Sequence, residues 1–223
     1  MDSDLTILLP AHNEERAIGL LIKQIMDEVH IPYVLLVINN ASSDNTRNVA
    51  LAGGAAVLLA PEKGKGNAVR KAIKAIATPY VIMMNADLTY PPAYVKLLYE
   101  ELVKGAEVVL GTRTIVDRGA MPFMNSIGNW GLSLLASTLY GYHVYDICTG
   151  MWGFRTSALT AFSLTSTHFT LEADMFVNAV KNQNKIRQVP IGYRARLDGD
   201  RPKLKVSDGL RIGKFLLCKR FGR

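Results

Sequence analysis

The stretch YVIMMNADL at residues 80–88 runs from a dense apolar segment directly into two oxygen-bearing side chains. A short apolar run of this kind is typical of a buried parallel strand. Asn85 and Asp87 lie two residues apart at its end, so their side chains point to the same side. Their oxygens suit a hard divalent cation, which would in turn hold a diphosphate. A strand-end turn in which Asp87 caps the local backbone is the alternative.

Similar apolar runs recur in the first half of the chain and alternate with helix-like segments. The expected strands are Leu5–Leu9, Tyr33–Ile38, Ala56–Ala60, Tyr80–Met84 and Glu107–Gly111, and the expected helices are Glu14–Val29, Asp44–Ala52, Gly66–Ala77 and Pro92–Lys104. This alternation predicts βαβ units. The 223 residues, 49% of them hydrophobic, are enough for one substantial core. We therefore predict an α/β fold with a mostly parallel sheet flanked by helices, in a single domain.

The second half has a looser pattern. Residues 119–145 carry no formal charge and resemble a membrane span, but Asn, Ser, Thr and Gly interrupt the apolar residues. We therefore expect one or two amphipathic helices that touch a membrane without crossing it. Further on, we expect a strand within residues 146–155, a helix over Leu171–Asn182, a strand over Ile186–Tyr193 and a helix over Asp208–Phe221.

Three more polar motifs follow strands of the first half: PAHNE at 10–14, NNASSD at 39–44 and KGKGN at 63–67. Lys65 opens a helix, where backbone amides and the lysine charge favour an anion, and a flexible turn is the alternative. Glu14 suits ribose hydroxyls and His12 suits a base, although a helix cap by Asn13 explains the same residues. Ligands of open α/β sheets bind beyond the carboxyl ends of the strands. The four motifs are therefore expected to form one pocket.

The formal net charge of +7 predicts anionic partners. Basic residues concentrate beyond residue 200, where only Asp208 opposes them. Nucleic acid is not an expected partner, because the chain has no motif of a nucleic-acid-binding fold. Cys148 and Cys218 lack metal-ligand spacing and indicate a reducing compartment, and the N-terminus lacks the basic start of a signal peptide. A cytoplasmic location is expected.

Taken in order, the motifs resemble those of family-2 inverting glycosyltransferases of GT-A (Rossmann-like) fold. The resemblance is closest to polyprenyl- and dolichyl-phosphate hexosyltransferases such as dolichyl-phosphate glucose and mannose synthases. Its elements are PxxNE from Pro10, the Asn39–Asp44 turn, GKGNAVR over Gly64–Arg70, Asn85–Leu88, GTR over Gly111–Arg113, DICTG over Asp146–Gly150, FTLE over Phe169–Glu172, and the basic element with Arg196 and Lys203. These elements cover nearly the whole chain.

The resemblance implies roles for individual residues. The nucleoside would be lined by Pro10, His12, Glu14, Ile38 and Asn40, and the remaining donor contacts would come from Lys65, Ala86 and Asp87. Mg²⁺ or Mn²⁺ would be held by Asp87 with Asn85 and Thr89. The catalytic residues would be Asp87 with Arg113, Arg196 and Lys203, the last three meeting the donor diphosphate and the acceptor phosphate.

The implied activity is transfer of a hexose from a nucleoside-diphosphate sugar to a polyprenyl or dolichyl phosphate, with inversion at the anomeric carbon. The GKGxAVR form favours a UDP-sugar. Residues 1–113 would bind the donor, residues 114–206 would form the acceptor side, and the basic amphipathic helix at 207–223 would hold the protein on the cytoplasmic membrane face. A glycosyltransferase with a soluble acceptor would share every donor motif.

Three positions that carry carboxylates in many members of the resembled family are amides here: Asn39, Asn40 and Asn85. The change at Asn85 removes charge from the predicted metal site, so metal dependence is weakened or basic residues take over leaving-group stabilisation. A non-catalytic nucleotide-sugar-binding protein is the alternative from a different class. A phosphosugar nucleotidyltransferase is disfavoured, because no glycine- and basic-rich loop follows the first strand.

Overall fold

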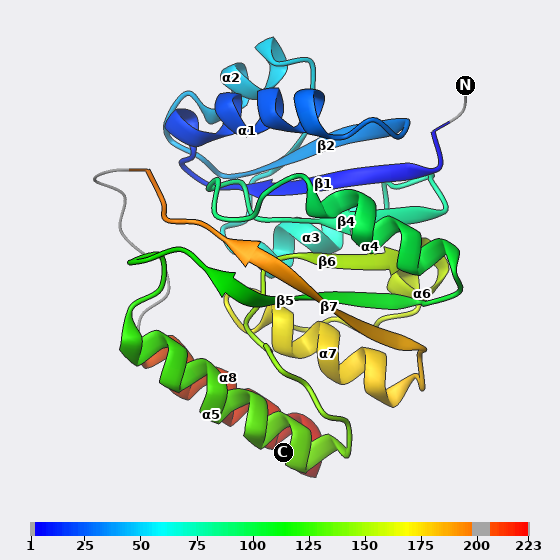
Figure 1. Cartoon of the computed structure of the whole chain (residues 1–223), viewed down its shortest axis with the longest axis vertical. Helices are drawn as coiled ribbons and strands as arrows, with labels where there is room; N and C mark the ends of the chain where they lie inside the picture. Colours follow the sequence, from blue (N-terminus) through cyan, green and yellow to red (C-terminus); the bar gives the residue numbers. More distant parts are fainter. Residues whose placement is uncertain (1–2, 198–205, 223) are drawn as a thin grey trace.

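The computed structural model describes residues 3–197 and 206–222. Its seven strands form one sheet in the order β3-β2-β1-β4-β6-β5-β7 (Figure 1). The strands are β1 (Leu5–Ala11), β2 (Tyr33–Asn40), β3 (Ala56–Ala60), β4 (Tyr80–Met83), β5 (Val108–Val116), β6 (Trp152–Arg155) and β7 (Ile186–Tyr193). All neighbours are parallel except β6, which runs antiparallel to both β4 and β5.

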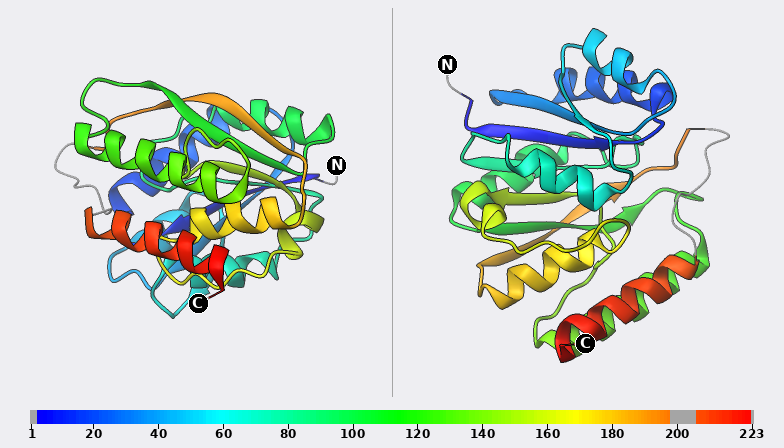
Figure 2. Two further views of the ribbon diagram at one scale, coloured as in Figure 1. Left: turned by 90° about the horizontal axis from the view of Figure 1, so that it is seen from below. Right: turned by 180° about the vertical axis from the view of Figure 1, so that it is seen from behind.

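Helices cover both faces of the sheet (Figures 1 and 2). They are α1 (Glu15–Glu28), α2 (Thr46–Ala52), α3 (Lys65–Ile73), α4 (Tyr94–Val103), α5 (Phe123–Tyr140), α6 (Thr156–Thr160), α7 (Leu171–Lys181) and α8 (Val206–Phe221). One core cluster joins the sheet to α1, α2 and α4, and the other joins it to α3, α5, α6, α7 and α8. Alternate strand residues enter opposite clusters, as Ile7 and Leu8 do, because successive strand side chains point to opposite faces.

In the first half of the chain the predicted strands and helices match the structure closely. In the second half the observed bounds differ more, because contacts between distant segments set them. The strand expected within 146–155 is only Trp152–Arg155, because residues 146–151 form a loop whose Asp146 and Thr149 bond to β5. Strand β5 extends past Gly111 to Val116 because β7 pairs along its whole length. The helix predicted over Gly66–Ala77 ends at Ile73.

The uncharged segment forms a single helix, α5, which lies alongside α8 at the end of the molecule next to β5 and β7 (Figures 1 and 2). Among the described residues, no helix is both long and apolar enough to cross a bilayer. Helix α8 docks through Ile212 and Leu216, which are buried. Its other stripe, with Leu210, Leu217 and Phe221, is exposed. The end of the sheet that carries the predicted site is therefore bordered by a pair of helices with outward-facing apolar side chains.

Candidate active site

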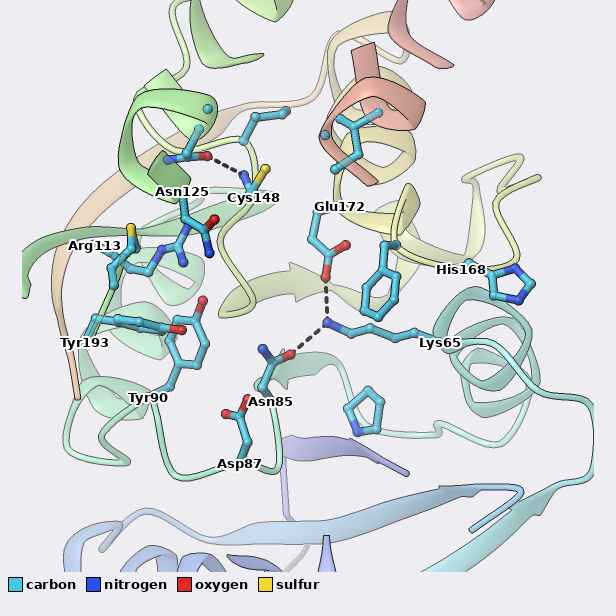
Figure 3. A pocket seen from close by; sticks show the side chains of 18 of the residues that line it. Lys65, Asn85, Asp87, Tyr90, Arg113, Asn125, Cys148, His168, Glu172 and Tyr193 are labelled. Atoms are coloured by element: carbon cyan, nitrogen blue, oxygen red, sulfur yellow. Dashed lines mark hydrogen bonds and ion pairs between the residues drawn. The ribbon is translucent and has the colours of Figure 1, made fainter. Parts of the chain in front are cut away.

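A pocket of about 560 Å³ opens at the carboxyl ends of β1, β2 and β4 and continues to α5 and α8. Its volume is in the range of small-molecule sites. We call the polar end the part lined by Pro10, His12, Glu14, Asn40, Lys65, Asn85, Asp87 and Glu172, and the apolar end the part lined by Met121, Met124, Ile127, Gly128, Leu132, Gly209 and Ile212. Arg113, Tyr90, Tyr193, Asn125 and Cys148 also line it (Figure 3).

The end of β1 and the end of β2 are tied together at the polar end. His12 Nδ1 lies 2.7 Å from the Asn40 carbonyl oxygen, and the Glu14 amide donates to Thr46 Oγ1 at 2.8 Å. Both His12 and Glu14 line the pocket, as predicted for residues that contact a nucleoside. Ile38 does not, since its side chain is wholly buried in the core beneath the sheet. Ile38 lies on the same face of β2 as Asn40 but two residues further from the end of the strand, so its contact with a nucleoside stays a prediction.

The glycine-rich turn before α3 differs from the expected anion cradle. The Gly64 amide donates to Asn40 Oδ1 at 3.1 Å, and the Gly66 amide donates to the Thr167 carbonyl at 3.1 Å. A Cβ on Gly66 would lie 2.1 Å from the Ser166 carbonyl oxygen, so glycine is needed for the turn to pack on the loop at 165–167. Because these two amides already have partners, the lysine ammonium is the main attraction for an anion here.

The ammonium of Lys65 is held between two oxygens at the polar end (Figure 3). Its Nζ donates to Glu172 Oε1 at 2.5 Å and to Asn85 Oδ1 at 2.7 Å. Asn85 packs closely against Gly150, since a Cβ on Gly150 would lie 2.5 Å from its amide nitrogen. Glu172 was not among the predicted site residues, although the FTLE motif contains it. Residues 65 and 172 are 107 positions apart, so only the fold could show this pair.

Asp87 is paired with a predicted catalytic cation. Arg196 Nη2 lies 2.6 Å from Asp87 Oδ2, while the Thr89 hydroxyl and amide donate to Asp87 Oδ1 at 2.5 and 3.3 Å. Thr89 is wholly buried, does not line the pocket and bonds to Asp87, so its place at a metal site stays a prediction. Ala86 lines the pocket between the two polar side chains. Lys203 lies outside the described residues.

Arg113 of β5 also lies in the pocket wall. Its Nε and Nη2 each lie 2.7 Å from an oxygen of Asp146, which is the two-point geometry of a strong arginine–carboxylate pair. Asn129 of α5 also donates to Asp146, and the guanidinium lies 5.0 Å from the centre of the Tyr193 ring. Burial opposes the charge, but Tyr90 and Asp146 hold the pKa of Arg113 well above its ordinary value. Arg113 is thus a fixed positive charge at neutral pH.

Two other titratable groups in the wall stay neutral. Burial raises the pKa of the Tyr90 phenol well above its ordinary value although Arg113 is near, and its oxygen accepts the Gly150 amide at 2.6 Å. Burial, with Asp146 nearby, also raises the pKa of the Cys148 thiol to about 12. Neither group is a base or nucleophile near neutral pH.

At the apolar end, α5 and α8 supply the wall and an exposed surface beside it. The outward stripe of α5 is formed by Phe123, Ile127, Trp130 and Leu134, and Trp130 is 67% exposed. Its spacing follows one helix face. On α8, Leu210 is 76% exposed and Phe221 is 69% exposed. Sequence alone placed these apolar residues on helices but did not show which of them lack cover from the rest of the protein.

A family model described as glycosyl transferase family 2 matches residues 6–162. The chain belongs to glycosyl transferase family 2. A glycosyltransferase of Haloferax volcanii, AglJ, is 33% identical over 219 residues, which cover 97% of this chain and 71% of that protein. The dolichyl-phosphate hexose transferase of the same organism is 32% identical over 96% of this chain and 92% of its own length.

Solved structures support the same fold. Glucosyl-3-phosphoglycerate synthase from Mycobacterium tuberculosis, in complex with Mn²⁺, UDP and glucosyl-3-phosphoglycerate, superposes with a TM-score of 0.80 at 22% identity. The match covers 99% of this chain and 80% of that one. A further structure of that synthase holds Mn²⁺ and UDP-glucose. This glycosyltransferase chain is therefore a single α/β domain of GT-A type, with its pocket at the sheet end expected for that fold.

Proposed function

We propose that the chain transfers a hexose from a UDP-sugar to a polyprenyl or dolichyl phosphate, with inversion at the anomeric carbon, on the cytoplasmic face of a membrane. The observation that carries the proposal is one continuous pocket whose polar end meets an apolar end walled by α5 and α8. A nucleoside diphosphate suits the first and a hydrocarbon chain suits the second. The relative named as a dolichyl-phosphate hexose transferase supports this acceptor class.

In this mechanism the acceptor phosphate oxygen attacks the anomeric carbon from the side opposite the diphosphate. The bond from that carbon to the diphosphate oxygen breaks, and its electron pair leaves with UDP. A phosphate monoester is already anionic near neutral pH, so no dedicated base is needed. The protein's contribution is then position and charge, which fits a wall whose Tyr90 and Cys148 are both neutral.

The charged side chains divide this work. Lys65 and Arg196 lie at the polar end, where the leaving diphosphate would gain charge, and Asp87 orients Arg196. Arg113 lies beside Asn125 of α5 (Figure 3), where it would meet the acceptor phosphate. Lys203 belongs to the same proposal through its motif. Residues 1–113 would supply most of the donor contacts and residues 114–206 most of the acceptor contacts, with Arg196 and Arg113 as the exceptions.

The membrane part of the proposal rests on the exposed apolar stripes of α5 and α8. A lipid surface is favoured as their occupant because basic side chains accompany them on α8, including the exposed Arg211, Lys214 and Arg220. Apolar residues would enter the headgroup boundary while the basic ones meet anionic lipids. The tail, residues 207–223, would then anchor the protein on the membrane next to the opening of the pocket.

The test uses purified protein, radiolabelled UDP- and GDP-sugars, and polyprenyl phosphate in detergent micelles. Label extracted into the organic phase from a UDP-sugar is the expected result. The variant Asp87→Asn should lower the rate on the order of 10²-fold, because Arg196 loses its orienting charge, whereas Asp27→Asn on the exposed side of α1 should not change it.

Two outcomes would contradict the proposal. Transfer to a small phosphorylated acceptor but never to the lipid would replace it by the soluble-acceptor function, the kind of reaction indicated by the name glucosyl-3-phosphoglycerate synthase. Nucleotide binding without transfer to any acceptor would favour a binding protein.

A further inference from the structure

The oxygens predicted to hold a divalent cation already have partners in this chain. Asp87 Oδ2 faces Arg196 at 2.6 Å, and Asp87 Oδ1 accepts from Thr89. Asn85 Oδ1 accepts from Lys65 at 2.7 Å. Among the described residues, no group of three or more His, Cys, Asp or Glu side chains is arranged to hold a metal ion. The donor set is one carboxylate and one amide, which is poor for a hard dication.

The charges around this point also oppose a dication. Two fixed cations, Lys65 and Arg196, contact the two candidate ligands directly. A divalent ion bound to the same oxygens would stand within a few ångströms of both, where like charges repel strongly at the low effective dielectric of a pocket. The predicted Mg²⁺ or Mn²⁺ therefore does not fit the residues as they are arranged.

The lysine is built into its place by more than one contact. Glu172 of α7 holds it at 2.5 Å, and both side chains are largely shielded, with 17% and 12% of their surface exposed. The preceding and following glycines pack against the loop at 165–167, which fixes the start of α3. Asn85 is held against Gly150. An ammonium positioned in this way needs little reorganisation to meet an incoming anion.

We infer that Lys65 and Arg196 replace the divalent cation of the predicted site and bind the donor diphosphate without a metal. This inference rests on the proposed function, because it assumes a nucleoside-diphosphate donor. On binding, phosphate oxygens become acceptors for Lys65 Nζ and Arg196 Nη2 in addition to Glu172 and Asp87. The neutral amides of Asn85 and Asn40 are consistent with this role, because they compete with the diphosphate for these cations less than carboxylates would.

The experiment measures UDP binding by calorimetry in EDTA and again in excess Mn²⁺. The dissociation constant is expected to differ less than threefold between the two conditions. Lys65→Met should weaken UDP binding in EDTA tenfold or more, whereas Lys65→Arg should keep most of it. Lys71→Met, an exposed lysine of the same helix, is the matched control and should bind as the parent does. Circular dichroism checks that each variant is folded.

A second variant tests the ligand set itself. Asn85→Asp restores a second carboxylate beside Asp87, so Mn²⁺ should bind in the presence of UDP and broaden its electron paramagnetic resonance signal, which the parent should not do. UDP binding by the parent only in Mn²⁺, or strengthened tenfold by it, would overturn the inference and leave the proposed function standing. Absence of UDP binding in both conditions would overturn both.

Discussion

The two ends of the pocket are built on opposite principles. At the polar end, side chains from distant parts of the chain hold one another, as Lys65, Asn85 and Glu172 do. At the apolar end, α5 and α8 turn residues such as Trp130 and Leu210 away from the protein. Their glycines show the same contrast, since a Cβ on Gly66 would strike backbone, whereas Gly128 and Gly131 have open space around them. The side chains of the polar end are covered and bonded within the protein, whereas the apolar end presents side chains that only a partner would cover.

The largest expected effect comes from the ion pair that joins the two ends. Asp146 holds Arg113 of β5 and Asn129 of α5, and both charged side chains are nearly inaccessible. Asp146→Asn leaves Arg113 buried without its counter-charge and should lower the free energy of unfolding by about 3–5 kcal/mol. Urea denaturation measures this.

The control for that experiment is Asp27→Asn, which removes the carboxylate partner of Lys23 on α1, where both side chains are more than half exposed. A loss at Asp146 no larger than at this surface pair would show that the two ends are not joined through Arg113.

A large effect is also expected at the polar end from Gly66→Ala. The added Cβ would lie 2.1 Å from the Ser166 carbonyl oxygen, so α3 and the loop at 165–167 must separate. Such overpacking costs about 1–3 kcal/mol of stability. Because Lys65 moves with α3, UDP affinity should fall roughly tenfold. Thermal denaturation measures the loss of stability and calorimetry the loss of UDP affinity. If neither changed, close packing at the polar end would not distinguish it from the apolar end.

At the apolar end, Trp130→Ser should weaken binding to vesicles that contain anionic lipid. Loss of one large inserted side chain removes about 1–2 kcal/mol, which is roughly a tenfold change in partition coefficient. Vesicle sedimentation measures the change, and UDP binding should be unaffected. Leu20→Ser is the matched control, since Leu20 is 50% exposed but lies on α1, away from this surface. Equal losses in the two variants would show that no specific membrane face exists.

A smaller effect of opposite sign is expected from Gly131→Ala. The position lies inside α5, and a Cβ there meets nothing within 4 Å. Alanine favours a helix interior over glycine by about 1 kcal/mol, so the free energy of unfolding should rise by up to that amount. A destabilised Gly131→Ala protein in thermal denaturation would mean that this face of α5 is covered.

The smallest effect concerns Cys148, where the two ends meet. Burial raises the pKa of its thiol to about 12, so at pH 8 only about one thiol in 10⁴ is ionised. In a Cys218→Ser background, Ellman's reagent should therefore label the folded protein very slowly and the urea-unfolded protein at once. Between about pH 9 and pH 12 the Cys148 thiol is protonated in the folded state but ionised in the unfolded state. The free energy of unfolding should therefore fall as the pH rises above about 9. Rapid labelling of the folded protein would contradict this.

Prediction from sequence was most successful where structure is local. The apolar runs placed β1 to β4 correctly, because strand periodicity depends on neighbouring residues. The roles predicted for Ile38 and Thr89 stay predictions, since both side chains are wholly buried next to the site. Burial at the end of a strand depends on the elements packed around it, which the local sequence does not show.

What the sequence by itself determined is the family, the fold and the four strand-end motifs, since each is encoded in short ordered patterns. What only the tertiary structure decided is which of those polar groups remain available to a ligand. Lys65 meets Glu172 from 107 residues away, and Arg196 meets Asp87. Charges compensate one another only when the groups are close in space. The tertiary structure, and not the order of residues, therefore decides how the ammonium, guanidinium and carboxylate groups of the pocket are paired.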